Sequence, residues 1–160
     1  MLAFRDDVQP NDPEHVRDIV TSSGFFSDEE INIAVELVTE RLEKGLASGY
    51  YFIFADENGR TVGYACFGPI PGTRASYDLY WIAVHDNQRG QGIGKQLLQR
   101  SEHSINQLGG KRIYIETSSR DQYVPTRSFY INNEYDTAAV LDDFYAPGDS
   151  KYIFVKELEN

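Results

Sequence analysis

The chain has few of the residues that would stabilise a small fold covalently or through a metal. Its 160 residues include one cysteine, Cys66, and three histidines. A single cysteine excludes an internal disulfide, and the surrounding apolar run VGYACF predicts a buried thiol rather than a nucleophile. None of His15, His85 and His103 lies at the spacing of metal ligands, so we predict no metal site.

Long hydrophobic runs and an excess of positive charge are also lacking. No apolar run approaches the roughly 20 residues that span a bilayer, and the first residues carry acids where a secretory signal has a basic start. We therefore expect a cytoplasmic protein without membrane contact. With 15 Lys and Arg against 25 Asp and Glu, the net charge of -10 argues against a nucleic-acid partner. The acidic balance fits either a cationic substrate or simple solubility.

The hydrophobic fraction of 41% is that of a globular protein, and the length predicts one domain over residues 1–160. Asp12 is predicted to cap a short first helix. Ser27 and Glu30 have the spacing of a capping box for a second helix that ends near Gly45 or Gly49. The patterns further predict, in chain order, a hairpin over 50–55 and 61–67, a strand over 77–84, a helix over 93–108, a strand over 111–117, a short helix over 125–132, and a closing antiparallel pair over 137–145 and 151–158. This order indicates a mixed α/β domain.

The stretch RGQGIG, residues 89–94, joins a predicted strand to a predicted helix. It is not a P-loop, because Arg89 stands where that motif needs glycine and Gln96 stands where it needs a magnesium-binding Ser or Thr. The dinucleotide fingerprint G-x-G-x-x-G fails as well, because these glycines are spaced G-x-G-x-G. Glycines let backbone N–H groups turn toward a ligand, and a helix N-terminus favours an anion. The stretch therefore predicts a pyrophosphate site.

At these residues the sequence resembles the GNAT superfamily of acyl-CoA N-acyltransferases. RGQGIG fits every fixed position of the family's acyl-CoA motif, [Q/R]-x-x-G-x-[G/A]. YWIAVHDN resembles the strand that lies along the pantetheine arm, and TRSFY resembles the helix that carries a tyrosine beside the CoA sulfur. The order of predicted elements also resembles the family's fold, a mixed and mostly antiparallel sheet flanked by helices and splayed at strands 4 and 5.

The resemblance implies an acetyltransferase that uses acetyl-CoA as its co-substrate. The acetyl group would pass directly, in a ternary complex, to a primary amine of a small molecule or of a protein, and no metal would take part. The resemblance also implies a homodimer. The residues implied to bind the cofactor are Ile82, Ala83, Val84, Arg89, Gly90, Gln91, Gly92, Ile93, Gly94, Lys95 and Phe129.

The resemblance further implies catalytic and acceptor-binding residues. Tyr130 is the candidate acid that protonates the leaving thiolate. Glu116 is the candidate base, and Asp78 is its rival. The loop over 22–26 and the closing pair are implied to border the acceptor cleft. The candidate acceptor-binding residues are Phe26, Asp78, Tyr123, Asp142 and Tyr145.

The sequence departs from the family at FYINNEY, where Glu134 stands in place of a frequent glycine. A helix that ends there commonly needs a left-handed residue, and Asn133 adopts that conformation more readily than Glu134, so the end of the helix stays open. Two alternatives for function also stay open: a domain of the same fold that binds acyl-CoA without turnover, and acyl transfer to an alcohol or a hydroxylamine. A serine hydrolase has no support, because no G-x-S-x-G motif is present.

Overall fold

The computed structural model describes residues 1–24 and 26–159. A seven-stranded sheet has the order β1-β2-β3-β4-β5-β7-β6, in which the β4–β5 pair is parallel and every other pair is antiparallel. The elements are β1 (Leu2–Arg5), α1 (Asp12–Ser22), α2 (Asp28–Lys44), η1 (Gly45–Ser48), β2 (Tyr51–Glu57), β3 (Arg60–Pro69), β4 (Ser76–Val84), η2 (Asp86–Gln88), α3 (Ile93–Gln107), β5 (Arg112–Ser118), η3 (Asp121–Tyr123), α4 (Val124–Asn132), β6 (Asp136–Ala146) and β7 (Asp149–Glu157). The expected mixed, mostly antiparallel sheet is confirmed.

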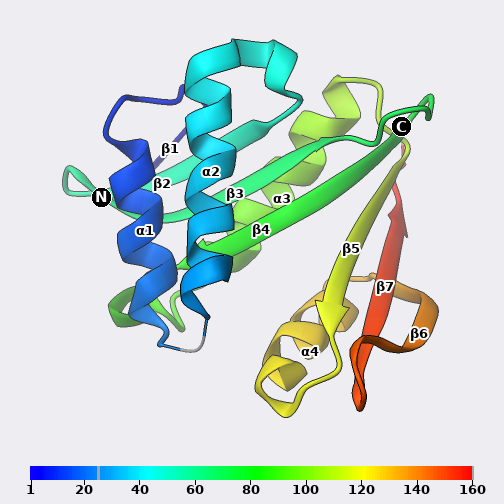
Figure 1. The fold of residues 1–160 in the computed structure, drawn as a ribbon. Helices are drawn as coiled ribbons and strands as arrows, with labels where there is room; N and C mark the ends of the chain where they lie inside the picture. Colours follow the sequence, from blue (N-terminus) through cyan, green and yellow to red (C-terminus); the bar gives the residue numbers. More distant parts are fainter. Residues whose placement is uncertain (25, 160) are drawn as a thin grey trace.

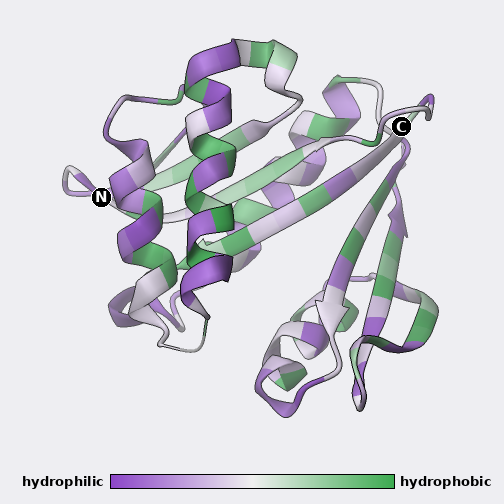
Figure 2. Ribbon diagram, in the orientation of Figure 1, coloured by the Kyte–Doolittle hydropathy of each residue, from purple (hydrophilic) through white to green (hydrophobic). Residues whose placement is uncertain are grey.

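The sheet separates two hydrophobic cores. On the front face, as seen in Figure 1, α1 and α2 pack against alternate side chains of β2 and β3, including Phe52 and Tyr64. On the rear face α3 and α4 pack against the intervening side chains, including Phe67 and Ile113. Figure 2 shows the corresponding pattern on α1 and α2, where hydrophobic and hydrophilic bands alternate along each helix. Among the described residues, no helix is long and apolar enough to cross a membrane.

Local sequence signals account for most element boundaries. The capping box is confirmed: Ser27 Oγ accepts the Glu30 N–H at 3.1 Å, and Glu30 Oε1 accepts the Ser27 N–H at 3.0 Å. The hairpin turn between β2 and β3 is also confirmed, because Asn58 and Gly59 both have positive φ values of 52° and 81°. Cys66 is buried, as expected, and burial raises the pKa of its thiol.

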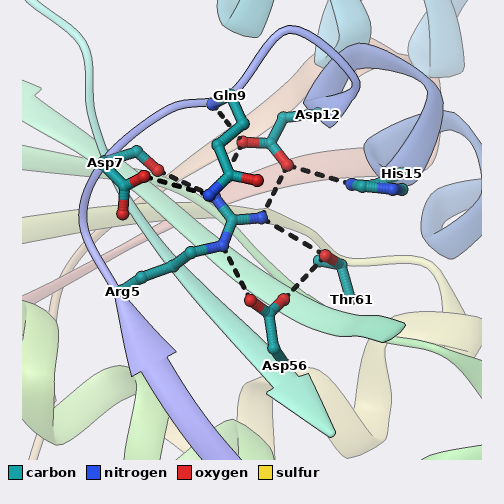
Figure 3. Close-up of polar contacts among 7 residues, drawn as sticks. All are labelled: Arg5, Asp7, Gln9, Asp12, His15, Asp56 and Thr61. Carbon is teal, nitrogen blue, oxygen red and sulfur yellow. Dashed lines mark hydrogen bonds and ion pairs between the residues drawn. The ribbon is translucent and has the colours of Figure 1, made fainter. Parts of the chain in front are cut away.

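The N-terminal strand β1 was not predicted, and the prediction for Asp12 is wrong. Asn11 is the N-cap and Asp12 is the first residue of α1. Asp12 is buried and accepts two hydrogen bonds from the Arg5 guanidinium, at 2.7 and 2.9 Å. Arg5 also donates to Asp56 at 2.8 Å, so one guanidinium joins β1, β2 and the start of α1 (Figure 3). A four-residue strand carries too little pattern to be found alone, and this partner of Asp12 is set by the tertiary structure.

The end of α4 corrects the expectation for Asn133. Asn133 has a φ of -104°, and the left-handed residue is Glu134, with a φ of 72°. The Tyr135 N–H then bonds to the Tyr130 carbonyl at 3.0 Å, and the two rings pack with their centroids 5.7 Å apart. This is a Schellman ending with its usual hydrophobic contact. The contact fixes the position of the left-handed residue, although an L-residue there is strained.

We expect Glu134→Gly to raise the free energy of unfolding by about 1 kcal/mol, because glycine adopts the left-handed conformation without the Cβ clash. Urea denaturation measures this change. Glu134→Ala is the matched control, since it removes the same exposed carboxylate and keeps the strain. A glycine variant no more stable than the alanine variant would contradict the account.

We expect the Arg5–Asp12 pair to make stability depend on pH in acid. Burial by itself raises the pKa of Asp12, but hydrogen bonds from Arg5, the Gln9 N–H and His15 outweigh it and lower the pKa below the usual 3.8. A carboxyl group with a lowered folded pKa contributes stability above its unfolded pKa and loses it as the pH falls through the folded pKa. The wild type should therefore lose stability below about pH 4 more steeply than Asp12→Asn.

The same pair can be tested at neutral pH. Arg5→Ala leaves a buried carboxylate without its cation and should cost about 3–5 kcal/mol in urea denaturation. A loss below about 1 kcal/mol would mean that the guanidinium is not what holds the start of α1.

Candidate active site

Strands β4 and β5 part after a short contact. They pair only from Ser76 to Asp78 on β4, opposite Arg112 to Tyr114 on β5, and then diverge (Figure 1). The β3–β4 register shifts at the same place, where Tyr80 falls between the paired residues Leu79 and Trp81. A bulge of this kind bends its strand. Beyond Asp78, no strand of the described chain pairs with the β5-facing edge of β4.

The parting opens a cavity of about 1040 Å³ that reaches both faces of the sheet. On the rear it is bounded by residues 88–95 and by α4, and on the front by α1, α2 and the segment before α2. Most of the predicted site lies on its wall, namely Phe26, Ile82, Ala83, Val84, Arg89, Gly90, Gly92, Ile93, Gly94, Lys95, Glu116, Tyr123, Phe129, Tyr130 and Tyr145. The fold thus brings together residues that are more than 100 positions apart in sequence.

The glycine stretch forms the N-terminal end of α3. Gly90 and Gly92 have φ values of 80° and 77°, which the loop needs in order to turn into the helix. Gly92 is the N-cap, so α3 has no side-chain cap and its first N–H groups stay available to a ligand. The exposed cations Arg89 and Lys95 flank these groups on the cavity wall. The arrangement is a site for an anion.

Tyr130 stands between the rear core and the cavity. Its side chain is 6% exposed and packs against Phe129, Tyr135 and Phe154. Burial raises the pKa of its phenol, so the phenol keeps its proton at neutral pH. Within residues 1–24 and 26–159 its hydroxyl has no hydrogen-bond partner, and Tyr130 lines the cavity. The phenol is a proton donor that faces the space where β4 and β5 part.

A smaller pocket of about 150 Å³ lies where the two strands begin to part. It contains both candidate bases, Asp78 and Glu116, and is completed by Leu79, Tyr80, Tyr114 and Tyr145. Four of these six residues, Leu79, Tyr80, Glu116 and Tyr145, also line the large cavity. The small pocket is therefore a side chamber of the same cleft.

The two carboxylates differ in their surroundings. Glu116 is half exposed and forms an ion pair with Lys151, 2.9 Å between Oε1 and Nζ. Asp78 is half buried, and its carboxylate has no hydrogen bond or ion pair within the described part of the chain. Burial, and then the charge of Glu116, raise the pKa of Asp78, while Lys151 lowers it. Asp78 is thus a carboxylate with a raised pKa and no side-chain partner among the described residues.

Two predicted residues are not brought to the cleft wall. Asp142 is an exposed residue of β6 and lines neither cavity, and Gln91 is an exposed loop residue that lines neither cavity. The loop over 22–26 does border the cleft through Phe26, and Phe25 lies outside the described residues. Among the described residues, no three His, Cys, Asp or Glu side chains group as metal ligands would.

The model of the acetyltransferase (GNAT) family matches residues 15–131, which include β4, the glycine loop, α3 and most of α4. The chain belongs to the GNAT acetyltransferase family. A crystal structure of a GNAT-family protein from Desulfovibrio desulfuricans is 45% identical to it, with a TM-score of 0.97 over 98% of this chain and 99% of that one.

Two further N-acetyltransferases resemble the chain less closely. The uncharacterized N-acetyltransferase YhbS of Escherichia coli strain K12 is 30% identical over 97 residues, which are 58% of this chain and 54% of YhbS. The chain thus spans about half the length of this curated relative. An aminoglycoside 6'-N-acetyltransferase complexed with coenzyme A has a TM-score of 0.77 at 18% identity, over 100% of this chain and 98% of that one, and shares the fold.

Sequence reasoning missed several residues on the wall of this GNAT cleft. Tyr80 and Trp81 lie within the strand that was identified, but its hydropathy pattern does not indicate that both side chains line the cleft beside the register shift. Tyr114 occupies the position of β5 that pairs with Asp78, and could have been found from the alternation of that strand. Ile33 falls on the face of α2 that borders the cleft.

Proposed function

We propose that residues 1–160 act as one GNAT domain that transfers the acetyl group of acetyl-CoA to a primary amine. The observation that carries the proposal is the uncapped N-terminus of α3, which opens into the cleft between β4 and β5 together with Tyr130. An anion-binding end and a buried proton donor in one cavity suit a phosphate-bearing thioester. The coenzyme A bound to the aminoglycoside 6'-N-acetyltransferase of the same fold supports this assignment.

The donors on the rear wall fit coenzyme A. The N–H groups over residues 90–95, with Arg89 and Lys95, suit a pyrophosphate. The hydroxyl of Thr117 is buried on the cavity wall without a hydrogen-bond partner among the described residues. An amide of the pantetheine arm would supply that partner. Acetyl-CoA, when bound, supplies a thioester carbonyl carbon for attack by the amine.

Asp78 is our proposed base. An alkylammonium has a pKa near 10, so its proton must leave before the nitrogen can attack. Asp78 accepts that proton, directly or through a water, because it lies in the side chamber and its pKa is raised by burial. Glu116 keeps Asp78 basic through its charge, while Lys151 holds Glu116 in place.

The chain also supplies groups for the charges that develop on oxygen and sulfur. On the β5-facing edge of β4 beyond Asp78, backbone N–H groups have no strand partner among the described residues and suit the carbonyl oxygen as it becomes negative. As the C–S bond breaks, Tyr130 donates its proton to the departing sulfur, and the phenolate regains a proton from the nitrogen, directly or through a water, as the amide forms. Burial makes the phenol a weaker acid, but it also makes a thiolate in the same cavity a stronger base.

Binding of acetyl-CoA is the direct test of the rear wall. We expect Gly92→Glu to weaken binding by about 100-fold or more in titration calorimetry, because a carboxylate would enter the anion site. Gly59→Glu is the matched control: Gly59 has a similar φ of 81°, lies in the β2–β3 turn, and should leave the affinity unchanged. Equal effects of both variants, or no binding by the wild type, would refute the proposed function.

Asp78→Asn tests the base. We expect kcat/KM for an amine to fall by about 100-fold or more, with acetyl-CoA affinity unchanged. The wild-type rate should fall as the pH drops through the raised pKa of Asp78, because only the ionised carboxylate accepts a proton. The rate of the Asp78→Asn variant should not show this fall.

Two further variants serve as comparisons for Asp78→Asn. Asp142→Asn makes the same change at an exposed carboxylate that lines neither cavity and should leave the rate unchanged. Glu116→Gln should lower the rate by less than about 10-fold, because it removes only a neighbouring charge. A Glu116 variant more impaired than the Asp78 variant would assign the base to Glu116 instead.

A further inference from the structure

The front of the cleft, where an acceptor would enter opposite the glycine loop, is lined mainly by aromatic and apolar side chains, with Glu30 and Ser23 beside them. We call it the aromatic chamber and define it by Phe26, Ile33, Tyr80, Trp81 and Tyr145. The rings of Phe26 and Trp81 meet edge to face, with their centroids 5.1 Å apart. Ile33 is 46% exposed and Tyr145 is 47% exposed, so both have apolar surface available to a ligand.

The acidic side chains around this chamber already have partners, with one exception. Glu30 accepts the N–H of Ser27 in the capping box, Glu116 is paired with Lys151, and Asp149 is bonded to Ser118 and Arg120. The carboxylate of Asp78 has no such partner among the residues that the structure describes. The chamber therefore combines a largely apolar wall with one carboxylate, at its inner end, that has neither a hydrogen bond nor an ion pair among the described residues.

We propose that the acceptor is a primary amine with a single positive charge on an apolar or aromatic body. Its ammonium group would lie beside Asp78, within reach of the rings of Tyr80, Tyr114 and Tyr145. Its body would lie against Phe26, Ile33 and Trp81. This inference rests on the proposed function, because the bound amine is an acceptor only if the protein transfers an acetyl group to it.

The same wall disfavours a polyamine or a polyhydroxylated amine. Each further ammonium or hydroxyl group would leave water for a wall made mostly of rings and an isoleucine, where few polar groups could replace its hydrogen bonds to water. A methylene group in that place removes apolar surface from water and adds affinity. The chamber thus selects the body of the amine, and Asp78 selects its charge.

Trp81 gives a direct readout, because it is the only tryptophan of the chain and part of the chamber wall. With coenzyme A present and the ionic strength fixed, propyl-, butyl-, pentyl- and hexylammonium are titrated and tryptophan fluorescence is recorded. We expect affinity to rise about fourfold for each added methylene. Spermidine should bind at least about 10-fold more weakly than hexylammonium.

A pair of variants on α2 isolates the chamber. Ile33→Asp should reduce the increase in affinity to less than about twofold per methylene, because a charge then faces the alkyl body of the amine. Leu42→Asp is the matched control: Leu42 is 39% exposed on the same helix, lines neither cavity, and should leave the series unchanged.

Affinity that does not depend on chain length, tighter binding of spermidine than of hexylammonium, or no fluorescence change with any amine would each overturn the inference. Acetyl transfer to hexylamine is measured separately by thiol release. If affinity follows the predicted series and no thiol is released, the protein binds singly charged apolar amines, and the proposed acetyl transfer is refuted.

Discussion

The site depends on one constraint of the backbone, the short parallel contact between β4 and β5. The two strands pair over three residues of β4, Ser76 to Asp78, and then separate where Tyr80 interrupts the register of β3 and β4. Meanwhile β5 stays paired with β7 along its whole length, so it cannot follow β4. A fully paired sheet would close the cavity. Its continuous wall would separate Asp78 from Tyr130 and the start of α3.

The separation of β4 and β5 also explains why we propose different roles for the rear and front halves of the cleft. The rear half presents uncapped N–H groups and exposed cations, and the front half presents aromatic rings and the carboxylate of Asp78, which has no partner among the described residues. A phosphate-bearing thioester and an amine can therefore approach from opposite faces and meet between the strands. Burial near this meeting point raises the pKa values of Asp78 and Tyr130 together, which favours a carboxylate that takes a proton and a phenol that keeps one.

The sequence predicted the features that depend on local backbone chemistry. RGQGIG locates the turn into α3 because Gly90 and Gly92 need positive φ, and the capping box locates the start of α2 through contacts three residues apart. What it missed depends on long-range contacts. Arg5 reaches Asp12 and Asp56 only in the folded sheet, and packing of Tyr135 on Tyr130 forces Glu134 into the left-handed region. Which of Asp78 and Glu116 is unpaired likewise depends on Lys151, from a strand more than 30 residues away.

A crystal structure of the protein with coenzyme A tests the central claim most directly. The account predicts the pyrophosphate on the N–H groups of residues 90–95 and the sulfur between β4 and β5, beside the hydroxyl of Tyr130. Coenzyme A bound outside this cleft, or bound in it with those N–H groups unengaged and the sulfur away from Tyr130, would contradict the account.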